Sequence, residues 1–230
     1  MQLLLHNPGA DTEQLGPGVA VSPRLVLTAL HGLCPVGSQF RILSQSADER
    51  TGLVSMVRFE VNKVDIALVR LQDGQPPFPY WLHVMSELPA IEEKVSVLSL
   101  QQGLNGGLGF ASQPSRIYMF DPATALRRAQ YYSIDGFSGS GIIAKNKSDG
   151  SVVVVGVHVA THGNSEAVPP FKRKWDGEID IESISTSTDA IIQNQHGLQS
   201  YCFICIVSLV TDVMEAISLD IESYGITCKS

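Results

Sequence analysis

The chain has 230 residues, of which 44% are apolar and 17% charged, and its formal net charge is −7. This composition is typical of a folded protein and does not indicate disorder. The negative charge argues against nucleic acid as the main partner, because nucleic-acid-binding domains usually present a basic surface. The length allows one domain of two subdomains or two small domains.

The N-terminus and the cysteines bear on the cellular compartment. Met1–His6 lacks the basic flank and the apolar length of a secretory signal. The four cysteines are too few and too clustered for a disulfide framework; they are Cys34, Cys202, Cys205 and Cys228. These features predict an intracellular, cytoplasmic protein in a reducing compartment.

Short apolar runs separated by turn residues fill the first third of the chain. Val19–Val21 and Leu25–Thr28 are separated by a Ser-Pro-Arg turn, which predicts a hairpin. Three further strands are expected at Phe40–Leu43, Val54–Val61 and Val64–Leu71. Together they predict a first β-barrel over residues 1–75.

A Pro-rich stretch ends this pattern and predicts an inter-barrel linker over residues 76–92. A second set of runs follows, at Lys94–Leu100, Arg116–Phe120, Ala129–Ile134, Gly141–Ala144 and Val152–Val159. Because helical periodicity is scarce before residue 188, the two sets predict an all-β protein with two small barrels. The second barrel is assigned to residues 93–195.

The C-terminal region is expected to contain a helix and an apolar extension, 196–230, of unknown role. Thr186–Ile192 resembles the start of a helix, with a hydroxyl residue available as its cap. Residues 201–218 are strongly apolar, but the uninterrupted part, 201–210, is about half of what a bilayer span needs. We interpret this segment as a packing helix or strand; a membrane-surface segment is the minority interpretation.

The stretch Asp135–Gly141 places one hydroxyl, that of Ser138, among glycines directly before an apolar run. Gly136 and Gly139 allow a turn with positive φ and a close approach of a substrate. Successive N–H groups in such a turn can point into one concavity, which suits a developing negative charge. Taken alone, the stretch is more simply a Gly/Ser surface turn.

Two other residues change that interpretation. An alcohol nucleophile needs a base to take its proton, and the base needs a partner that fixes its tautomer. His31 directly follows the apolar run ending at Leu30, and Asp65 opens an apolar strand, where an ionised carboxylate needs a hydrogen-bonded partner. We therefore predict that His31, Asp65 and Ser138 meet in one site.

Three segments resemble the signature segments of trypsin-like serine peptidases: Leu25–His31, Asp65–Leu68 and Gly136–Ser140. These enzymes have the chymotrypsin fold, with two six-stranded antiparallel β-barrels and a catalytic triad in the cleft between them. The order His, Asp, Ser is that of this family and differs from the order in α/β-hydrolases.

The resemblance implies a role for each matched residue. His31 would be the general base, Asp65 would orient it, and Ser138 would be the nucleophile. The backbone N–H groups of Gly136 and Ser138 would form the oxyanion hole. The implied partner is a polypeptide substrate, with no cofactor and no metal; the alternative is a catalytically inactive peptide-binding or regulatory module on the same fold.

The chain departs from the family pattern at two places. Phe137 stands where digestive members have an aspartate that pairs with a new N-terminus, so no such activation step is expected. Cys34 has no plausible partner near Val19 for the disulfide that is usual beside the histidine. Both departures fit the bacterial-type and intracellular branches of the family.

The resemblance also suggests a specificity pocket with His158 and Ser133. Glutamyl endopeptidases, and picornaviral relatives with a cysteine nucleophile, place a histidine and a hydroxyl residue at these two positions. A neutral imidazole and a hydroxyl can hydrogen-bond Gln, whereas a protonated imidazole pairs with Glu. The alternative is a core histidine. Tyr132 stands where trypsin-type pockets have an aspartate, so no preference for Lys or Arg is expected.

Two further patterns are given structural interpretations. Cys202–Cys205 has the spacing of a metal knuckle, but there is no second pair and its surroundings are apolar. Gly103–Gly109 lacks the Lys-Ser/Thr of a phosphate-binding loop and is expected to be a hairpin loop.

Overall fold

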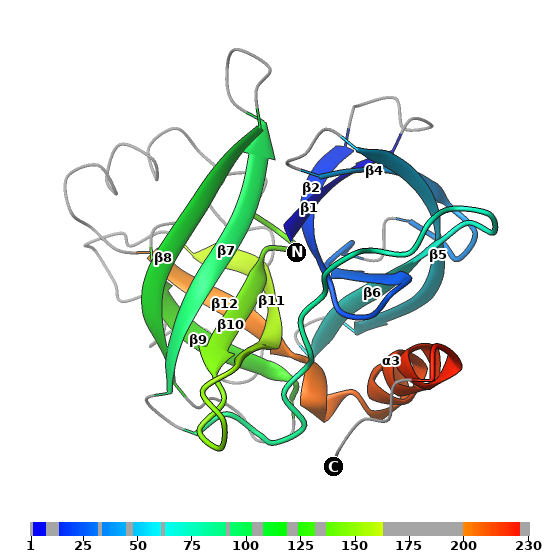
Figure 1. Ribbon diagram of the computed structural model, residues 1–230. Coiled ribbons are helices and arrows are strands. Elements are labelled where there is room, and N and C mark those ends of the chain that lie inside the picture. The colour runs from blue at the N-terminus through cyan, green and yellow to red at the C-terminus, as the bar shows by residue number, and fades with distance from the viewer. Residues whose placement is uncertain are drawn as a thin grey trace.

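Two closed antiparallel β-barrels of six strands each make up the protein (Figure 1). The computed structural model describes residues 2–7, 14–31, 34–44, 48–60, 63–90, 93–102, 108–118, 124–131, 137–162 and 200–225. The predicted all-β architecture with two six-stranded barrels is therefore confirmed.

The first barrel follows the order β1-β2-β3-β6-β5-β4, and β1 pairs with β4 to close it. Its strands are β1 (Gln2–Asn7), β2 (Gln14–Ala20), β3 (Leu25–Thr28), β4 (Gln39–Leu43), β5 (Glu49–Glu60) and β6 (Val64–Leu71). Alternate residues point inward, as Phe40 and Ile42 of β4 do, and they pack with Leu5, Val26 and Val69 in the barrel interior. The sequence pattern does not predict β1.

The second barrel follows the order β10-β11-β12-β9-β8-β7 and is closed by pairing of β10 with β7. Its strands are β7 (Lys94–Gln102), β8 (Leu108–Tyr118), β9 (Leu126–Tyr131), β10 (Gly141–Lys145), β11 (Val152–His162) and β12 (Ser200–Ile206). Its interior contains Val97, Ile117, Ile142, Val155 and Ile204.

The assignment of residues 196–230 to an extension outside the barrel is wrong, because β12 inserts between β11 and β9. The apolar segment 201–218 divides into β12, the 3-10 turn η2 (Val207–Leu209) and the start of helix α3 (Thr211–Ser223). No helix in the described part of the chain is long and apolar enough to cross a membrane. The helix expected at Thr186–Ile192 lies outside the described residues.

The two barrels share a third apolar core. Leu27 and Ile66 of the first barrel pack in one cluster with Val157 of the second barrel and Ile217 of α3. The segment between β6 and β7 also bonds to both barrels: Leu82 N donates to Ala20 O at 2.9 Å, and Met85 N donates to Val154 O at 2.8 Å. Shared packing and these bonds fix how the barrels face each other.

Candidate active site

His31 lies just beyond the end of β3, in a backbone conformation that is unusual for a residue with a side chain. Its φ is 49°, and it is the only residue other than glycine with a positive φ in the described ranges. This left-handed conformation costs about 1–2 kcal/mol. The backbone N–H of His31 donates to Asp65 Oδ1 at 3.0 Å, which compensates part of that cost.

The carboxylate of Asp65 has a second contact, with the ring of the same histidine. Asp65 is the second residue of β6, and its side chain is 7% exposed, whereas that of His31 is 37% exposed. Its Oδ2 forms a short hydrogen bond with His31 Nδ1. With Nδ1–H donating to the carboxylate, Nε2 is left as the acceptor, which is the tautomer a general base requires.

Ser138 completes a continuous chain of hydrogen bonds. His31 Nε2 lies 2.9 Å from Ser138 Oγ, so the hydroxyl can donate to the ring nitrogen. The hydroxyl lies 3.2 Å from a second acceptor, the backbone carbonyl of Val159 on β11. The three side chains predicted to meet, those of His31, Asp65 and Ser138, are therefore brought together in the structure, two from the first barrel and one from the second.

The turn that carries Ser138 is fixed on both sides. Ser140 N donates to Phe137 O, and Gly139 N donates to His158 O, each at 2.8 Å. Gly139 has a φ of 93°, and a Cβ atom there would overlap the Pro17 carbonyl oxygen and Thr28 Oγ1 of the first barrel. Only a glycine lets the turn approach β2 and β3 this closely.

His158 lies beside this turn and is buried, with 2% of its surface exposed. Its Nδ1 is 2.5 Å from the hydroxyl of Tyr131, and the ring of Phe137 packs edge-on at a centroid distance of 6.1 Å. Burial and, to a smaller extent, the nearby His31 lower the pKa of His158 to about 3. Burial also raises the pKa of Tyr131. The pair is therefore neutral near pH 7.

No local sequence pattern identifies Tyr131 as a partner of His158, because the register of β9 opposite β12 is set only in the folded barrel. Two other predicted residues, Ser133 and Gly136, lie outside the described residues, as does Tyr132. Their roles in a pocket and an oxyanion hole stay predictions.

The three cysteines in the described part of the chain are buried in apolar cores. Cys202 packs in the interior of the second barrel, whereas Cys205 packs in the core shared by the two barrels, so the two thiols face different surroundings. Burial raises the pKa of Cys205 to about 12. Cys34 is buried in the first barrel and is not in a disulfide. This placement gives the Cys202–Cys205 pair a packing role.

No family model matches the sequence, and no curated protein matches it. Solved structures do match its fold. A mutant of tobacco etch virus protease is 15% identical, with a TM-score of 0.57 over 94% of this chain and 77% of that one. The active form of the Rv3671c protease from M. tuberculosis is 19% identical, with a TM-score of 0.56 over 94% and 79%. The chain has a chymotrypsin-like fold.

A third neighbour is a serine endoprotease from Yersinia pestis, 17% identical, with a TM-score of 0.55 over 95% of this chain and 63% of that one. All three neighbours are proteases. At these identities the likeness concerns the fold alone, and the chemistry of the site depends on the side chains of this chain.

Proposed function

We propose that this protein is a serine endopeptidase. The observation that carries the proposal is the unbroken chain of hydrogen bonds from the Asp65 carboxylate through both ring nitrogens of His31 to Ser138 Oγ. A neutral serine hydroxyl is a weak nucleophile, and such a chain supplies the base and the counter-charge that activate it. Two of the neighbours with this fold are named as a serine endoprotease and as a protease complexed with substrate, which supports a polypeptide substrate.

The reaction begins when Ser138 Oγ attacks the carbonyl carbon of the scissile peptide bond and its proton passes to His31 Nε2. Asp65 stabilises the imidazolium that forms. The tetrahedral intermediate then collapses: the C–N bond breaks, and His31 gives its proton to the departing amine. Water hydrolyses the resulting ester, with His31 accepting the proton of the water and returning it to Ser138 Oγ. The backbone N–H of Ser138, with that of Gly136 by resemblance, would stabilise the oxyanion.

We further propose that the enzyme prefers Gln to Glu before the scissile bond. His158 is neutral near pH 7 because burial holds its pKa at about 3. If the Tyr131 hydroxyl donates to Nδ1, the ring proton is on Nε2, where it can donate to the side-chain oxygen of Gln. A Glu carboxylate would bring an unpaired charge beside these neutral, buried rings, which is costly. By resemblance, Ser133 would be the second contact.

A fluorophosphonate probe that reacts with activated serines tests the catalytic proposal. Wild-type protein is expected to become labelled, and Ser138→Ala is expected to lose the label while it keeps the same circular dichroism spectrum. Absence of labelling of the folded wild type would refute the peptidase and favour the peptide-binding module.

A pair of peptides that differ only in Gln or Glu before the cleaved bond tests the specificity. We expect kcat/KM for the Gln peptide to be higher by about tenfold or more, which is about 1.4 kcal/mol of transition-state binding. The His158→Ala variant should lose most of this difference. Equal rates for the two peptides in the wild type would refute the assignment of the pocket.

A further inference from the structure

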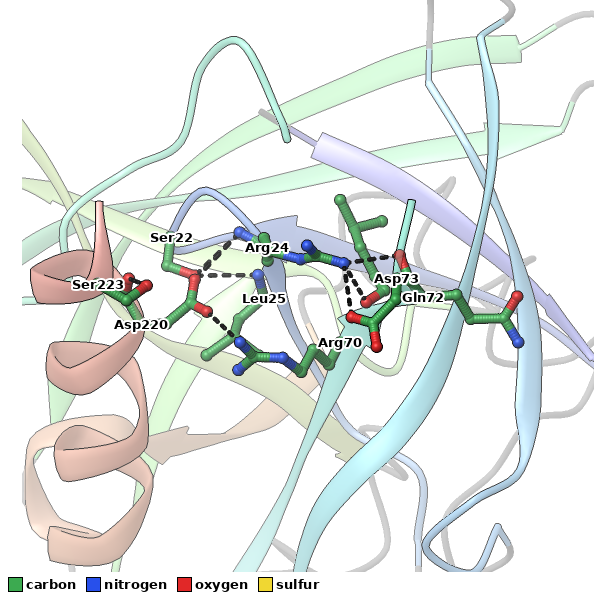
Figure 2. Close-up of polar contacts among 9 residues, drawn as sticks. Ser22, Arg24, Leu25, Arg70, Gln72, Asp73, Asp220 and Ser223 are labelled. Atoms are coloured by element: carbon green, nitrogen blue, oxygen red, sulfur yellow. Dashed lines mark hydrogen bonds and ion pairs between the residues drawn. The ribbon is translucent and has the colours of Figure 1, made fainter. Parts of the chain in front are cut away.

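Helix α3 carries a buried acid, Asp220, that contacts the first barrel (Figure 2). Its carboxylate is 0% exposed. Ser22 Oγ donates to Oδ2 at 2.7 Å, and the backbone N–H of Arg24 donates to the same oxygen at 3.2 Å. Arg70 Nη2 forms an ion pair with Oδ1 at 2.9 Å that lacks the geometry of a hydrogen bond. We refer to Ser22, Arg24, Arg70 and Asp220 as the Asp220 cluster.

The cluster is itself bonded to the surrounding backbone. The amide of Leu25 donates to Ser22 Oγ at 2.9 Å, which orders the turn between β2 and β3. The guanidinium of Arg24 donates to Leu71 O at 3.0 Å and to Gln72 O at 2.6 Å, at the end of β6 (Figure 2). Asp220 is therefore bonded to a rigid part of the first barrel.

The Asp220 cluster lies at one end of the strand pair β3–β6. This pair carries His31 and Asp65, the two residues that the first barrel contributes to the candidate active site. Strands β3 and β6 are antiparallel neighbours, with Leu25 opposite Arg70. At the other end of the pair, β3 leads into His31, and β6 begins beside Asp65. A shift of the pair relative to Asp220 would therefore move both residues together.

Helix α3 also connects Asp220 to the second barrel. Helix α3 follows β12 through η2, and β12 pairs with β11, whose His158 accepts a hydrogen bond from the Ser138 turn. The apolar face of α3, with Val213, Ile217 and Ile221, packs in the core shared by the barrels. Apolar packing permits small sliding, whereas hydrogen bonds to a carboxylate have defined directions.

We propose that Asp220 is a positioning residue: through α3 it fixes the strand pair β3–β6 relative to the second barrel and so sets the distance between His31 and Ser138. The proposal rests on the proposed peptidase function for its kinetic consequence. A misplacement of about 1 Å between reacting groups can reduce the rate on the order of a hundredfold.

The first experiment measures the rate of fluorophosphonate labelling per folded molecule. Asp220→Ala is expected to slow labelling by about tenfold or more. In peptide hydrolysis kcat should fall with KM nearly unchanged, because the substrate contacts remain. Asp220→Asn keeps the shape of the side chain and one acceptor oxygen, so it is expected to slow labelling less than Asp220→Ala does. If Asp220→Ala does not fold, the labelling rate of Asp220→Asn tests the proposal in its place.

Two controls separate positioning from general stability. Ile42→Ala removes a side chain that is 1% exposed in the interior of the first barrel, away from the cluster. It should lower the melting temperature without changing the labelling rate of the folded fraction. Leu219→Ala changes the neighbouring residue on α3, which is 67% exposed, and should change neither. A wild-type labelling rate in folded Asp220→Ala and Asp220→Asn would overturn the proposal and leave the peptidase function intact.

A second measurement does not depend on catalysis. Spin labels are attached at Gln39→Cys on the first barrel and Lys145→Cys on the second, both exposed positions, in a Cys228→Ser background. Double electron–electron resonance measures the distance between the two labels. It should give one narrow distance distribution in the protein with Asp220 and a broader or shifted distribution in Asp220→Asn. If the wild type is not labelled by the fluorophosphonate, the peptidase proposal fails, and this distribution alone decides the role of Asp220. The same distance distribution in the wild type and in Asp220→Asn would overturn the positioning role of Asp220.

Discussion

The neutral state of His158 has a consequence for stability that can be measured. Burial, with a smaller contribution from His31, lowers the pKa of His158 from 6.5 to about 3. Below about pH 6.5 the unfolded chain therefore binds a proton here that the folded protein does not bind. The free energy of unfolding rises with pH wherever the unfolded state binds more protons, so this contribution is lost as the pH falls from 6.5 toward 3.

The two pKa values give the size of the effect. Between about pH 7 and pH 5, His158 should lower the free energy of unfolding by about 2 kcal/mol, and the full difference below pH 3 is about 5 kcal/mol. Tyr131, whose hydroxyl contacts the ring, stays neutral over this range because burial raises its pKa. The expected loss is therefore assigned to the imidazole.

Urea unfolding of Ser138→Ala and of Ser138→Ala with His158→Gln provides the assay. The first substitution prevents self-digestion, and the second removes the titrating imidazole. All other histidines and carboxylates are common to both proteins, so their contributions cancel in the difference. We expect the protein with His158 to lose about 2 kcal/mol more than its partner between about pH 7 and pH 5. Parallel losses would show that His158 is protonated in the folded state and would refute the reasoning.

Three further predictions concern the turn, the orienting carboxylate and the pocket. Gly139→Ala should destabilise the protein by more than about 2 kcal/mol and abolish labelling, because its Cβ would overlap Pro17 and Thr28. The control is Gly74→Ala, a glycine with a φ of +83° and open space around it, which should lower the free energy of unfolding by only about 1 kcal/mol in chemical denaturation. Equal losses for the two variants would contradict the overlap at Gly139. Asp65→Asn should lower kcat by about 10³–10⁴-fold in peptide hydrolysis, because the amide favours the wrong tautomer of His31; a loss below tenfold would exclude the orienting role. Tyr131→Phe should reduce the preference for Gln peptides about tenfold without stopping hydrolysis; an unchanged ratio of kcat/KM values would show that the hydroxyl does not set the tautomer.

The sequence predicted the two barrels and the meeting of His31, Asp65 and Ser138 because each lies in a short segment with a strong local pattern. It did not predict β12, since the apolar run from Tyr201 to Val210 fits a strand as well as a buried helix. The choice between strand and helix depends on the rest of the barrel, which closes only when a strand lies between β11 and β9.

The polar contacts that depend on long-range register could not be predicted. Asp220 lies in an amphipathic helix, where acidic side chains are usually solvated, and its partner Ser22 is 198 residues away in the sequence. Tyr131 carried no local signal that its hydroxyl would meet the ring of His158, because the register of β9 against β12 is set by the whole barrel. Such pairs follow from the packing of complete barrels, which short patterns do not encode.

Asp65 has two functions in this structure, and they are mechanically linked. One oxygen binds the backbone N–H of His31 and the other binds its ring, so the carboxylate both stabilises a left-handed backbone and fixes a tautomer. The carboxylate that stabilises the strained backbone is therefore the same one that orients the ring. Under the proposed peptidase function, loss of Asp65 would therefore change both the position of the His31 ring and the charge that balances its protonated form.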